Sequence, residues 1–380
     1  MPKKKKKKVR RFYDYSLLFT VVFLTIFGLV MIYSSSSYMA QINYEGNAGY
    51  FMTRQASIAL GGFFLMILIS RMDYHWYARF SRLAILVSWG LMIAVSLFGR
   101  EVNGKKRWLG VGPLSFQPTE LVKITVIVAM AVLITRIGRD VDRIAGVARA
   151  VLIVVPLAGI VAANNLSSGI IIVGIGFVMM FVASKKRLPY ALCVLAAAFM
   201  LIFAGPIGHA LTAMKILKPY QLNRINVWLN PEAYPSTGGY QVLQGLYAIG
   251  SGGLFGKGLG ESIQKLGFVP ESQNDMIFSI ICEELGLFGA CLVIFLFVFM
   301  IYRFLLIAGN APDLFGALLV VGVMAHIAIQ VILNIAVVTN TIPNTGITLP
   351  FISYGGTSVL FLMIEMGMVL SVSNQIKLER

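Results

Sequence analysis

Residues 15–34 read YSLLFTVVFLTIFGLVMIYS, a run of apolar and small polar side chains that contains no charged residue. An α-helix of roughly 20 such residues is long enough to cross the hydrocarbon core of a membrane. The chain offers about ten windows of this kind, which are 15–34, 56–70, 83–98, 121–135, 151–163, 168–184, 188–211, 276–308, 314–341 and 357–372. The sequence therefore predicts an all-α, polytopic membrane protein with about ten transmembrane helices and a long extracytoplasmic loop between the seventh and the eighth.

The composition supports the same fold class. Hydrophobic residues make up 58% of the chain and charged residues only 13%, and the mean hydropathy is +0.80. That is too few charges to cover the surface of a soluble globule of this length. The net charge of +16 is compatible with nucleic-acid binding, but the basic residues are divided by membrane side rather than gathered on one surface. We expect no nucleic-acid partner.

The positive charges instead predict the orientation in the membrane. If the N-terminus lies in the cytoplasm, 21 of the 32 Lys and Arg residues fall on the cytoplasmic side, in agreement with the positive-inside rule. The domains are then a basic cytoplasmic segment 1–14, a ten-span membrane domain 15–372 that includes the extracytoplasmic loop 211–275, and a cytoplasmic tail 373–380. The lysine run at 3–8 is interpreted as an anchor to anionic lipid.

The loop 211–275 ends in PESQNDM (270–276), immediately before the apolar run of the eighth window. Asp275 at this position fits two roles. It could cap the helix, because Asp is a preferred N-cap residue. It could also be a base, since the amides and dipole of a helix N-terminus favour the ionised carboxylate at neutral pH.

Charged residues inside a bilayer are costly, so each is a candidate for function and needs a partner. Glu120 and Lys123 are three residues apart at the start of the fourth window and can form an ion pair on one helix face. The alternative to a functional role for this pair is a structural one that fixes the helix against a neighbour.

Two stripes of polar residues follow the period of a helix. The first consists of Asp275, Ser279 and Glu283, with Glu284 beside it. It could face a cavity, but Arg or backbone partners within the bundle are the better explanation for Glu283 and Glu284. The second suits hydrogen bonds between helices and consists of His326, Gln330 and Asn334. Glu365 in the last window has no evident partner in the sequence.

An outer carboxylate with outer basic clusters suits an anionic substrate. Transfer of a sugar from a diphosphate requires a base for the attacking hydroxyl and cations for the leaving group. Asp275 fits the first requirement, and Lys105, Lys106, Arg107 or a divalent cation such as Mg²⁺ or Mn²⁺ fits the second. A proton-coupled transporter could use the same carboxylates as a relay.

Four motifs carry a resemblance to a known family. They are KRWL (106–109) with FQPTELVK (116–123), AIGSGGLFG (248–256), PESQNDMIF (270–278) with EELG (283–286), and TGITLPFISYGG (345–356). Together they resemble the shape, elongation, division and sporulation (SEDS) family, the polytopic peptidoglycan glycosyltransferases that include FtsW and RodA.

The resemblance implies an enzyme of the bacterial cytoplasmic membrane with cytoplasmic termini, which polymerises lipid II into glycan strands on the outer face. It carries the family's essential aspartate onto Asp275 as the catalytic residue, and the family's substrate-binding positions onto Arg107, Glu120 and Lys123. It also implies a class B penicillin-binding protein as transpeptidase partner, together with other membrane proteins of the divisome or elongasome.

The sequence also departs from the family pattern. Asn165 stands where many members have an acidic residue before the sixth span, so we expect no catalytic role there. The residues YQ (240–241) with QGLY (244–247), followed by SQND (272–275), are more similar to FtsW and to sporulation members than to RodA. This similarity favours a role in cell division or sporulation. The alternatives are an elongation polymerase of the RodA type, a lipid II flippase or transporter, and a non-catalytic scaffold.

Overall fold

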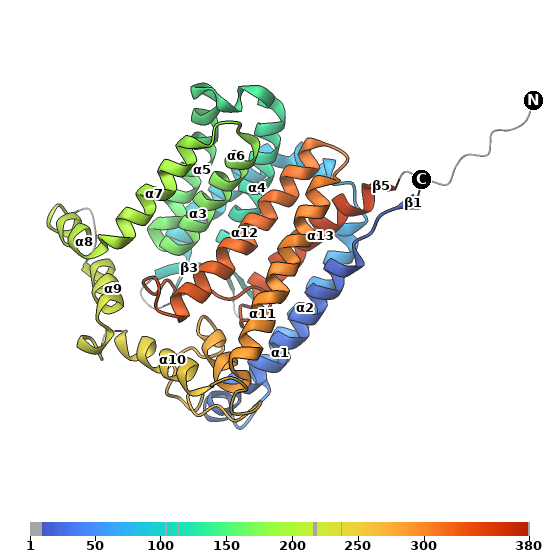
Figure 1. The fold of residues 1–380 in the computed structure, drawn as a ribbon. Helices are drawn as coiled ribbons and strands as arrows, with labels where there is room; N and C mark the ends of the chain where they lie inside the picture. Colours follow the sequence, from blue (N-terminus) through green and yellow to red (C-terminus); the bar gives the residue numbers. More distant parts are fainter. Residues whose placement is uncertain (1–9, 103–104, 112–113, 216–218, 237, 379–380) are drawn as a thin grey trace, which may run out of the picture.

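The computed structural model describes residues 10–102, 105–111, 114–215, 219–236 and 238–378. Helices dominate this part of the chain (Figure 1). The α-helices are α1 (Tyr15–Asn43), α2 (Tyr50–Ser70), α3 (His75–Phe98), α4 (Pro118–Ile137), α5 (Ile144–Asn164), α6 (Leu166–Ala183), α7 (Leu188–Ile202), α8 (Ala204–Ala213), α9 (Pro219–Leu229), α10 (Gly239–Ser251), α11 (Ile277–Gly309), α12 (Leu314–Val338) and α13 (Thr357–Gln375). Two short 3₁₀ helices are η1 (Gly138–Asp142) and η2 (Pro231–Ala233).

Nine helices in the described residues are long and apolar enough to cross a membrane, and α7 with α8 gives a tenth if that pair is one span. The polytopic helical fold expected from the sequence is thus confirmed. The seventh window is not the single straight helix that was expected, because α7 and α8 meet at an angle of 82°. Pro206 in the first turn of α8 explains the break. It has no N–H to donate, and in a continuous helix its ring would clash with the carbonyl of Ile202, the last residue of α7.

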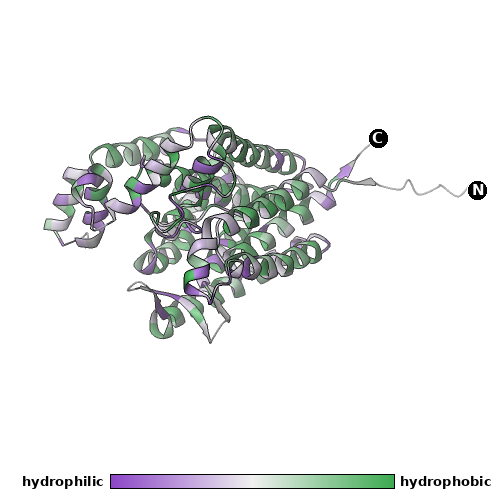
Figure 2. Ribbon diagram, turned by 90° about the horizontal axis from the view of Figure 1, so that it is seen from below, coloured by the Kyte–Doolittle hydropathy of each residue, from purple (hydrophilic) through white to green (hydrophobic). Residues whose placement is uncertain are grey.

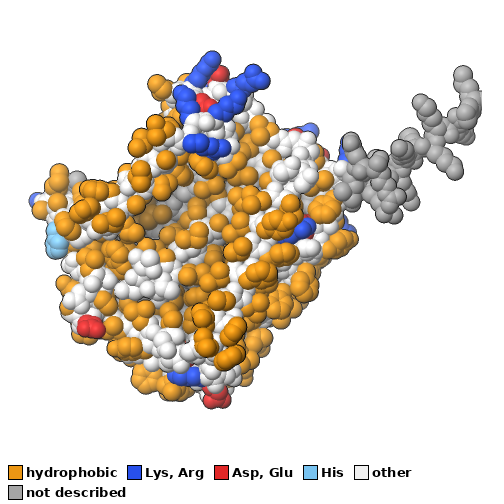
Figure 3. All heavy atoms as spheres, in the orientation of Figure 1, with side chains coloured by type: hydrophobic (Ala, Val, Ile, Leu, Met, Phe, Trp, Pro, Cys, Tyr) orange, Lys and Arg blue, Asp and Glu red, His pale blue; other side chains and the backbone are white. Residues whose placement is uncertain are grey.

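Three spans form the interior of the bundle. The most apolar windows of α12 and α13 are each 67% buried and that of α4 is 61% buried, whereas those of α2 and α3 are only 22% buried. No residue of α7 is buried. Figure 2 shows that the helices are apolar over most of their length. Figure 3 shows apolar side chains over much of one face of the molecule, with charged side chains gathered mainly at its two ends. The exposed apolar faces are those that contact lipid in a membrane.

The helix α11 is interrupted at Gly286, which has φ of +65°. The segment that follows α10 packs into this break and exchanges backbone hydrogen bonds with it: Lys257 N donates to Glu283 O at 2.9 Å, and Leu287 N donates to Gly253 O at 3.0 Å. A Cβ on Gly256 would lie 2.1 Å from the carbonyl oxygen of Glu284. The approach therefore requires glycine there.

Two small sheets supplement the helices. In the first, β1 (Arg10–Arg11) pairs with β5 (Lys377–Leu378), which brings the two ends of the described chain together. Two chain ends that lie side by side are expected when the chain crosses the membrane an even number of times. The second is antiparallel, in the order β2 (Arg100–Val102), β3 (Lys105–Val111), β4 (Leu114–Phe116). It holds the basic segment 105–107 at the opposite end of the bundle, next to the start of α4 (Figure 1).

Candidate functional site

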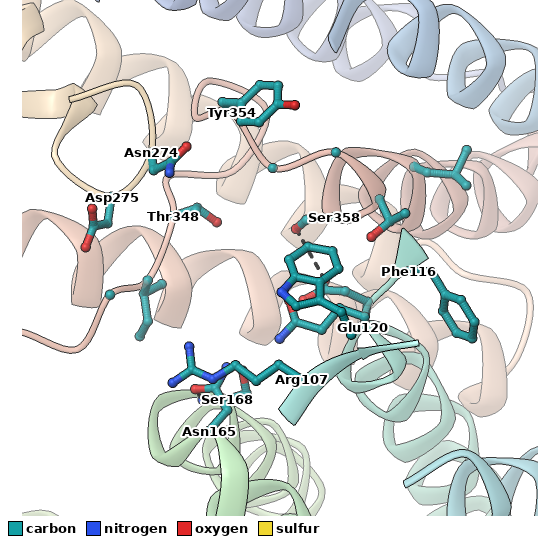
Figure 4. A pocket seen from close by; sticks show the side chains of 18 of the residues that line it. Arg107, Phe116, Glu120, Asn165, Ser168, Asn274, Asp275, Thr348, Tyr354 and Ser358 are labelled. Carbon is teal, nitrogen blue, oxygen red and sulfur yellow. Dashed lines mark hydrogen bonds between the residues drawn. The ribbon is translucent and has the colours of Figure 1, made fainter. Parts of the chain in front are cut away.

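A cavity of about 1120 Å³ opens beside β3 and the first turns of α4 and α6. The helix α2, the segment before α11 and the segment between α12 and α13 also line it. All four residues that the sequence predicted for the site line this one cavity, namely Arg107, Glu120, Lys123 and Asp275. Figure 4 shows Arg107, Glu120 and Asp275 around the same space, each supplied by a different part of the chain.

Asp275 does not cap a helix. The helix α11 begins at Ile277, its N-cap residue is Met276, and no side chain makes a capping hydrogen bond there. The capping role that the sequence allowed for Asp275 is therefore wrong. Its carboxyl group lines the cavity instead, close enough to Gly346 that a Cβ at that position would lie 3.7 Å from Oδ2.

The ionisation of Asp275 also differs from the expectation. Burial raises the pKa of its carboxyl group from 3.8 to about 7, and the negative charge of Glu271 acts in the same direction. The backbone amides of Asp275 and Met276 and the charge of Arg224 lower this pKa, but by less than burial raises it. The cost of desolvating the ionised carboxylate therefore exceeds the stabilisation that these two amides and Arg224 give it.

The backbone around Asp275 is tied to neighbouring elements. Asn334 on α12 donates from Nδ2 to the carbonyl oxygen of Asp275 at 2.8 Å, and also to that of Ile347 at 2.7 Å. The amide of Tyr354 donates to the carbonyl oxygen of Gln273 at 2.8 Å. The segment that carries Asp275 and the segment between α12 and α13 therefore form one wall of the cavity.

Glu120 and Lys123 form the ion pair that their spacing predicted. Lys123 Nζ lies 2.9 Å from Glu120 Oε2, and the two side chains are only 3% and 8% exposed. Pro118 occupies the first turn of α4, where its missing N–H costs no helical hydrogen bond. Ser358 on α13 donates to Glu120 Oε2 at 3.4 Å. The ammonium group of Lys123 therefore lies on the cavity wall with its charge balanced by the carboxylate of Glu120.

Arg107 reaches the cavity from β3, and its Nε donates to the carbonyl oxygen of Asn164 at 3.1 Å. Lys106 turns elsewhere, donating to Leu97 O at the end of α3, and it is not among the cavity-lining residues. The side chain of Lys105 lies outside the described residues. Of the two described side chains in the basic cluster that the sequence proposed for a diphosphate, that of Arg107 lines the cavity and that of Lys106 does not.

Sequence reasoning missed two basic residues of the cavity, Arg54 on α2 and Arg100 on β2. Neither stands in one of the motifs quoted above, and 46 positions separate them in the chain. Only the packing of α2 and of the small sheet brings them to the same space. Asn165 lines the cavity as well, but its side chain accepts a hydrogen bond from the amide of Ser168 and so caps α6.

The stripe below Asp275 does not face the cavity. Glu283 and Glu284 are fully buried and pair with lysines of the loop: Glu283 with Lys257 at 2.7 Å and Glu284 with Lys265 at 2.8 Å. Ser34 on α1 also donates to Glu284 at 2.6 Å. The expected structural role of these acids is confirmed. Their charged partners are lysines rather than the expected arginine, backbone amides donate to Glu283 as well, and the alternative of a cavity-facing stripe is wrong.

Glu365 has a partner that the sequence did not indicate. His326 Nδ1 lies 2.8 Å from Glu365 Oε2, and both side chains are 1% exposed. The contact joins α12 to α13, in line with the interhelical hydrogen bonding expected for the stripe on α12.

The donor set of the cavity does not by itself make a metal site. Among the described residues, no group of three or more His, Cys, Asp or Glu side chains could hold a metal ion. The carboxylate of Glu120 is already paired with Lys123, which leaves it less available as a metal ligand. An Mg²⁺ or Mn²⁺ ion here would depend on a bound diphosphate for several of its oxygen ligands.

Comparisons with known proteins agree with this architecture. The family model of FtsW, RodA and SpoVE, described as a cell cycle protein, matches residues 15–378. Stage V sporulation protein E of Bacillus subtilis (strain 168) is 38% identical over 94% of this chain and 95% of its own length. The probable peptidoglycan glycosyltransferase FtsW of the same strain is 38% identical over 98% of this chain and 93% of its own length.

Two solved structures have the same fold. A chain from a peptidoglycan synthase complex that coordinates polymerization and crosslinking superposes with a TM-score of 0.77 at 28% identity, over 96% of this chain and 98% of that one. The crystal structure of the rod shape determining protein RodA from Thermus thermophilus superposes with a TM-score of 0.70 at 24% identity, over 96% and 97% of the two chains. The second similarity concerns the fold alone.

Proposed function

Because this chain belongs to the cell cycle protein family of FtsW, RodA and SpoVE, we propose that it is a peptidoglycan glycosyltransferase that polymerises lipid II into glycan strands. The observation that carries this proposal is the cavity, in which a carboxyl group with a pKa of about 7 stands among basic side chains. A base and several cations are the groups that sugar transfer from a diphosphate requires.

Asp275 is the general base in this mechanism. Its carboxylate takes the proton of the acceptor hydroxyl, and the oxygen attacks the anomeric carbon of the donor sugar. The bond from that carbon to the diphosphate oxygen breaks, the electron pair leaves with undecaprenyl diphosphate, and the configuration at the anomeric carbon inverts. A general base is most effective when its pKa lies near the working pH, and the pKa of Asp275 meets that condition.

The basic side chains of the cavity hold the leaving diphosphate. Arg107 and Lys123 are the basic members of the set Arg107, Glu120 and Lys123 that the family resemblance assigned to substrate binding. Arg54 and Arg100 add two further guanidinium groups to the same wall. Fixed cations that are already in place stabilise developing phosphate charge more strongly than water, which must reorient. Glu120 serves this arrangement by fixing the position of Lys123.

A divalent cation could share this role by bridging diphosphate oxygens. We propose it as a component that arrives with the substrate, because the side chains present supply too few ligands for a resident ion. Polymerisation after treatment with EDTA, followed by addition of Mg²⁺ or Mn²⁺, tests this: restored activity supports a substrate-borne cation, and full activity in EDTA excludes a requirement.

The reaction takes place on the outer face of the bacterial cytoplasmic membrane, with both termini in the cytoplasm. The charge distribution over the loops supports this orientation. Similarity to a chain of a peptidoglycan synthase complex supports a class B penicillin-binding protein as partner. We further propose that other divisome proteins bind this chain, and that it acts in division or sporulation, as its FtsW and stage V sporulation relatives suggest. Locating a tagged copy at the septum, the forespore or the side wall tests that role.

The second candidate function is transport of lipid II across the membrane. The buried pair of His326 and Glu365 favours it, because ionisable groups inside a span are typical of transport pathways. Purified protein in detergent separates the two functions, since a micelle has no second leaflet. Glycan polymer formed from lipid II under these conditions supports the polymerase, and folded protein that makes none supports transport.

A further inference from the structure

The helix α12 carries a polar stripe whose members all bind other elements. His326 contacts Glu365 on α13, Gln330 donates to the carbonyl oxygen of Thr348 at 3.0 Å, and Asn334 donates to the carbonyl oxygens of Asp275 and Ile347. The stripe therefore joins α12 in turn to α13, to the segment before α13, and to the segment before α11. Its last member is the one in contact with the proposed base.

Asn334 is suited to fixing a backbone position. Its side chain is 0% exposed, and the two N–H bonds of Nδ2 match the two carbonyl oxygens that lie 2.8 and 2.7 Å away. The side-chain oxygen Oδ1 is buried and has no hydrogen-bond partner among the described residues. An unsatisfied buried acceptor costs free energy, so the residue is a poor choice for packing alone. The two hydrogen bonds that its NH₂ group donates explain why an asparagine occupies this position.

Asp275 needs such a support. It lies outside the regular turns of α11, and no side-chain capping bond holds the start of that helix. The preceding segment is irregular, with Glu271 at a φ of +55°. Asn334 is a direct side-chain contact to the backbone of Asp275 itself, and it ties that residue to the segment that carries Gly346 and Thr348 on the cavity wall.

We propose that Asn334 is a positioning residue that sets where the carboxyl group of Asp275 stands in the cavity. This inference rests on the proposed function, because it assumes that Asp275 is the base. Loss of the amide would let the Asp275 backbone move away from α12 and give its carboxyl group more water. A displacement of about 1 Å at a reacting group lowers a rate by about 100-fold.

The test is Asn334→Ala, measured as lipid II polymerisation by the purified protein. We expect kcat to fall by about 100-fold with little change in KM, and the acid limb of the pH–rate profile to move to lower pH as the carboxyl group gains water. In an Asp275→Asn background the same substitution should cause no further loss, because residues that act as a unit are not additive.

A matched control is Ser88→Ala, which removes a buried hydrogen bond of 2.9 Å to Thr125 between α3 and α4, outside the cavity-lining residues. It should lower thermal stability without moving the pH profile. If Asn334→Ala does not yield folded protein, Asn334→Leu, which is close in size, lacks the NH₂ group and adds no charge near Asp275, replaces it with the same expectation.

Parental kcat and an unshifted pH profile in either folded Asn334 variant would overturn the positioning role, as would a further loss in the Asp275→Asn background. The proposed function fails separately: if Asp275→Asn alone remains active, Asp275 is not the base. If Asp275→Asn is inactive while Asn334→Ala is fully active, only the inference about Asn334 is lost.

Discussion

Lys123 Nζ lies 2.9 Å from Glu120 Oε2, and this almost fully buried ion pair forms part of the wall of the cavity that contains Asp275. A buried pair is a weak contributor to net stability, because the desolvation of two charges offsets much of their attraction. Its place in the cavity instead suits a cation held ready for an anionic substrate.

Exchange of the two residues distinguishes these roles. If the pair is only structural, Glu120→Lys with Lys123→Glu should restore most of what either single change loses. We expect the exchange to remain inactive, because it moves the cation by nearly one helical turn along α4, away from the diphosphate. Lipid II polymerisation at matched membrane levels is the measurement, and recovered activity would assign the pair to structure alone.

A second prediction concerns the buried pair of Lys265 and Glu284, whose side chains are 6% and 0% exposed. Lys265→Met leaves the carboxylate of Glu284 without its cation, so we expect a loss of about 3–5 kcal/mol in the free energy of unfolding. Adding Glu284→Gln should recover much of it, because the uncompensated charge is removed. The shift in thermal unfolding in detergent checks both.

The matched control for that pair is the exposed one between Arg143 and Asp140, whose side chains are 76% and 54% exposed. Arg143→Ala should cost less than about 1 kcal/mol. Equal shifts in unfolding temperature for Arg143→Ala and Lys265→Met would show that breaking the buried pair of Lys265 and Glu284 costs no more stability than breaking an exposed pair.

The pH dependence of the rate follows from the raised pKa of Asp275. The base must be ionised, so the rate should fall as the pH drops through about 7. Glu271→Gln removes a negative charge that raises this pKa and should move the acid limb to lower pH, whereas Arg224→Gln removes a positive charge that lowers it and should move the limb to higher pH. Shifts in the same direction, or a flat profile between pH 5 and 9, would argue against Asp275 as the titrating group.

The orientation in the membrane can be tested with single cysteines in a background that lacks Cys193, Cys282 and Cys291. Probes at the exposed residues Ser236 and Glu261 should react in intact cells, and a probe at exposed Lys186 only after the cells are opened. Ser262 is unsuitable, because it is buried and donates a hydrogen bond to Glu283. The reverse labelling pattern would place the cavity in the cytoplasm and remove the proposed substrate from its reach.

Local sequence features predicted much of this molecule. The apolar windows located the spans, since the length of an apolar run depends only on neighbouring residues. The spacing of Glu120 and Lys123 predicted their ion pair for the same reason, as both lie on one helix turn. The four candidate residues were found in motifs, and the structure shows that they line one cavity.

Contacts between distant segments could not be predicted. Glu365 and His326 are 39 positions apart, and Ser34 and Glu284 are 250 apart, so only the packing of the helices pairs them. The predicted ionisation of Asp275 was wrong for a related reason. The sequence shows that a helix follows this residue, but it does not show the burial that desolvates the carboxyl group. The break in the seventh window occurs near Pro206. It was not predicted, because the window was assigned from its continuous apolar character and the proline within it was not considered.

The role of Asp275 is tested most directly by Asp275→Asn, assayed as lipid II polymerisation by purified protein at amounts matched to the parent. The change keeps the size of the side chain and removes only its ability to accept a proton. Glu261→Gln, an exposed acid in the same loop, is the matched control and should leave the rate unchanged. The proposed mechanism predicts folded Asp275→Asn protein that is slower by about 100- to 10,000-fold; activity within a few-fold of the parent would contradict it.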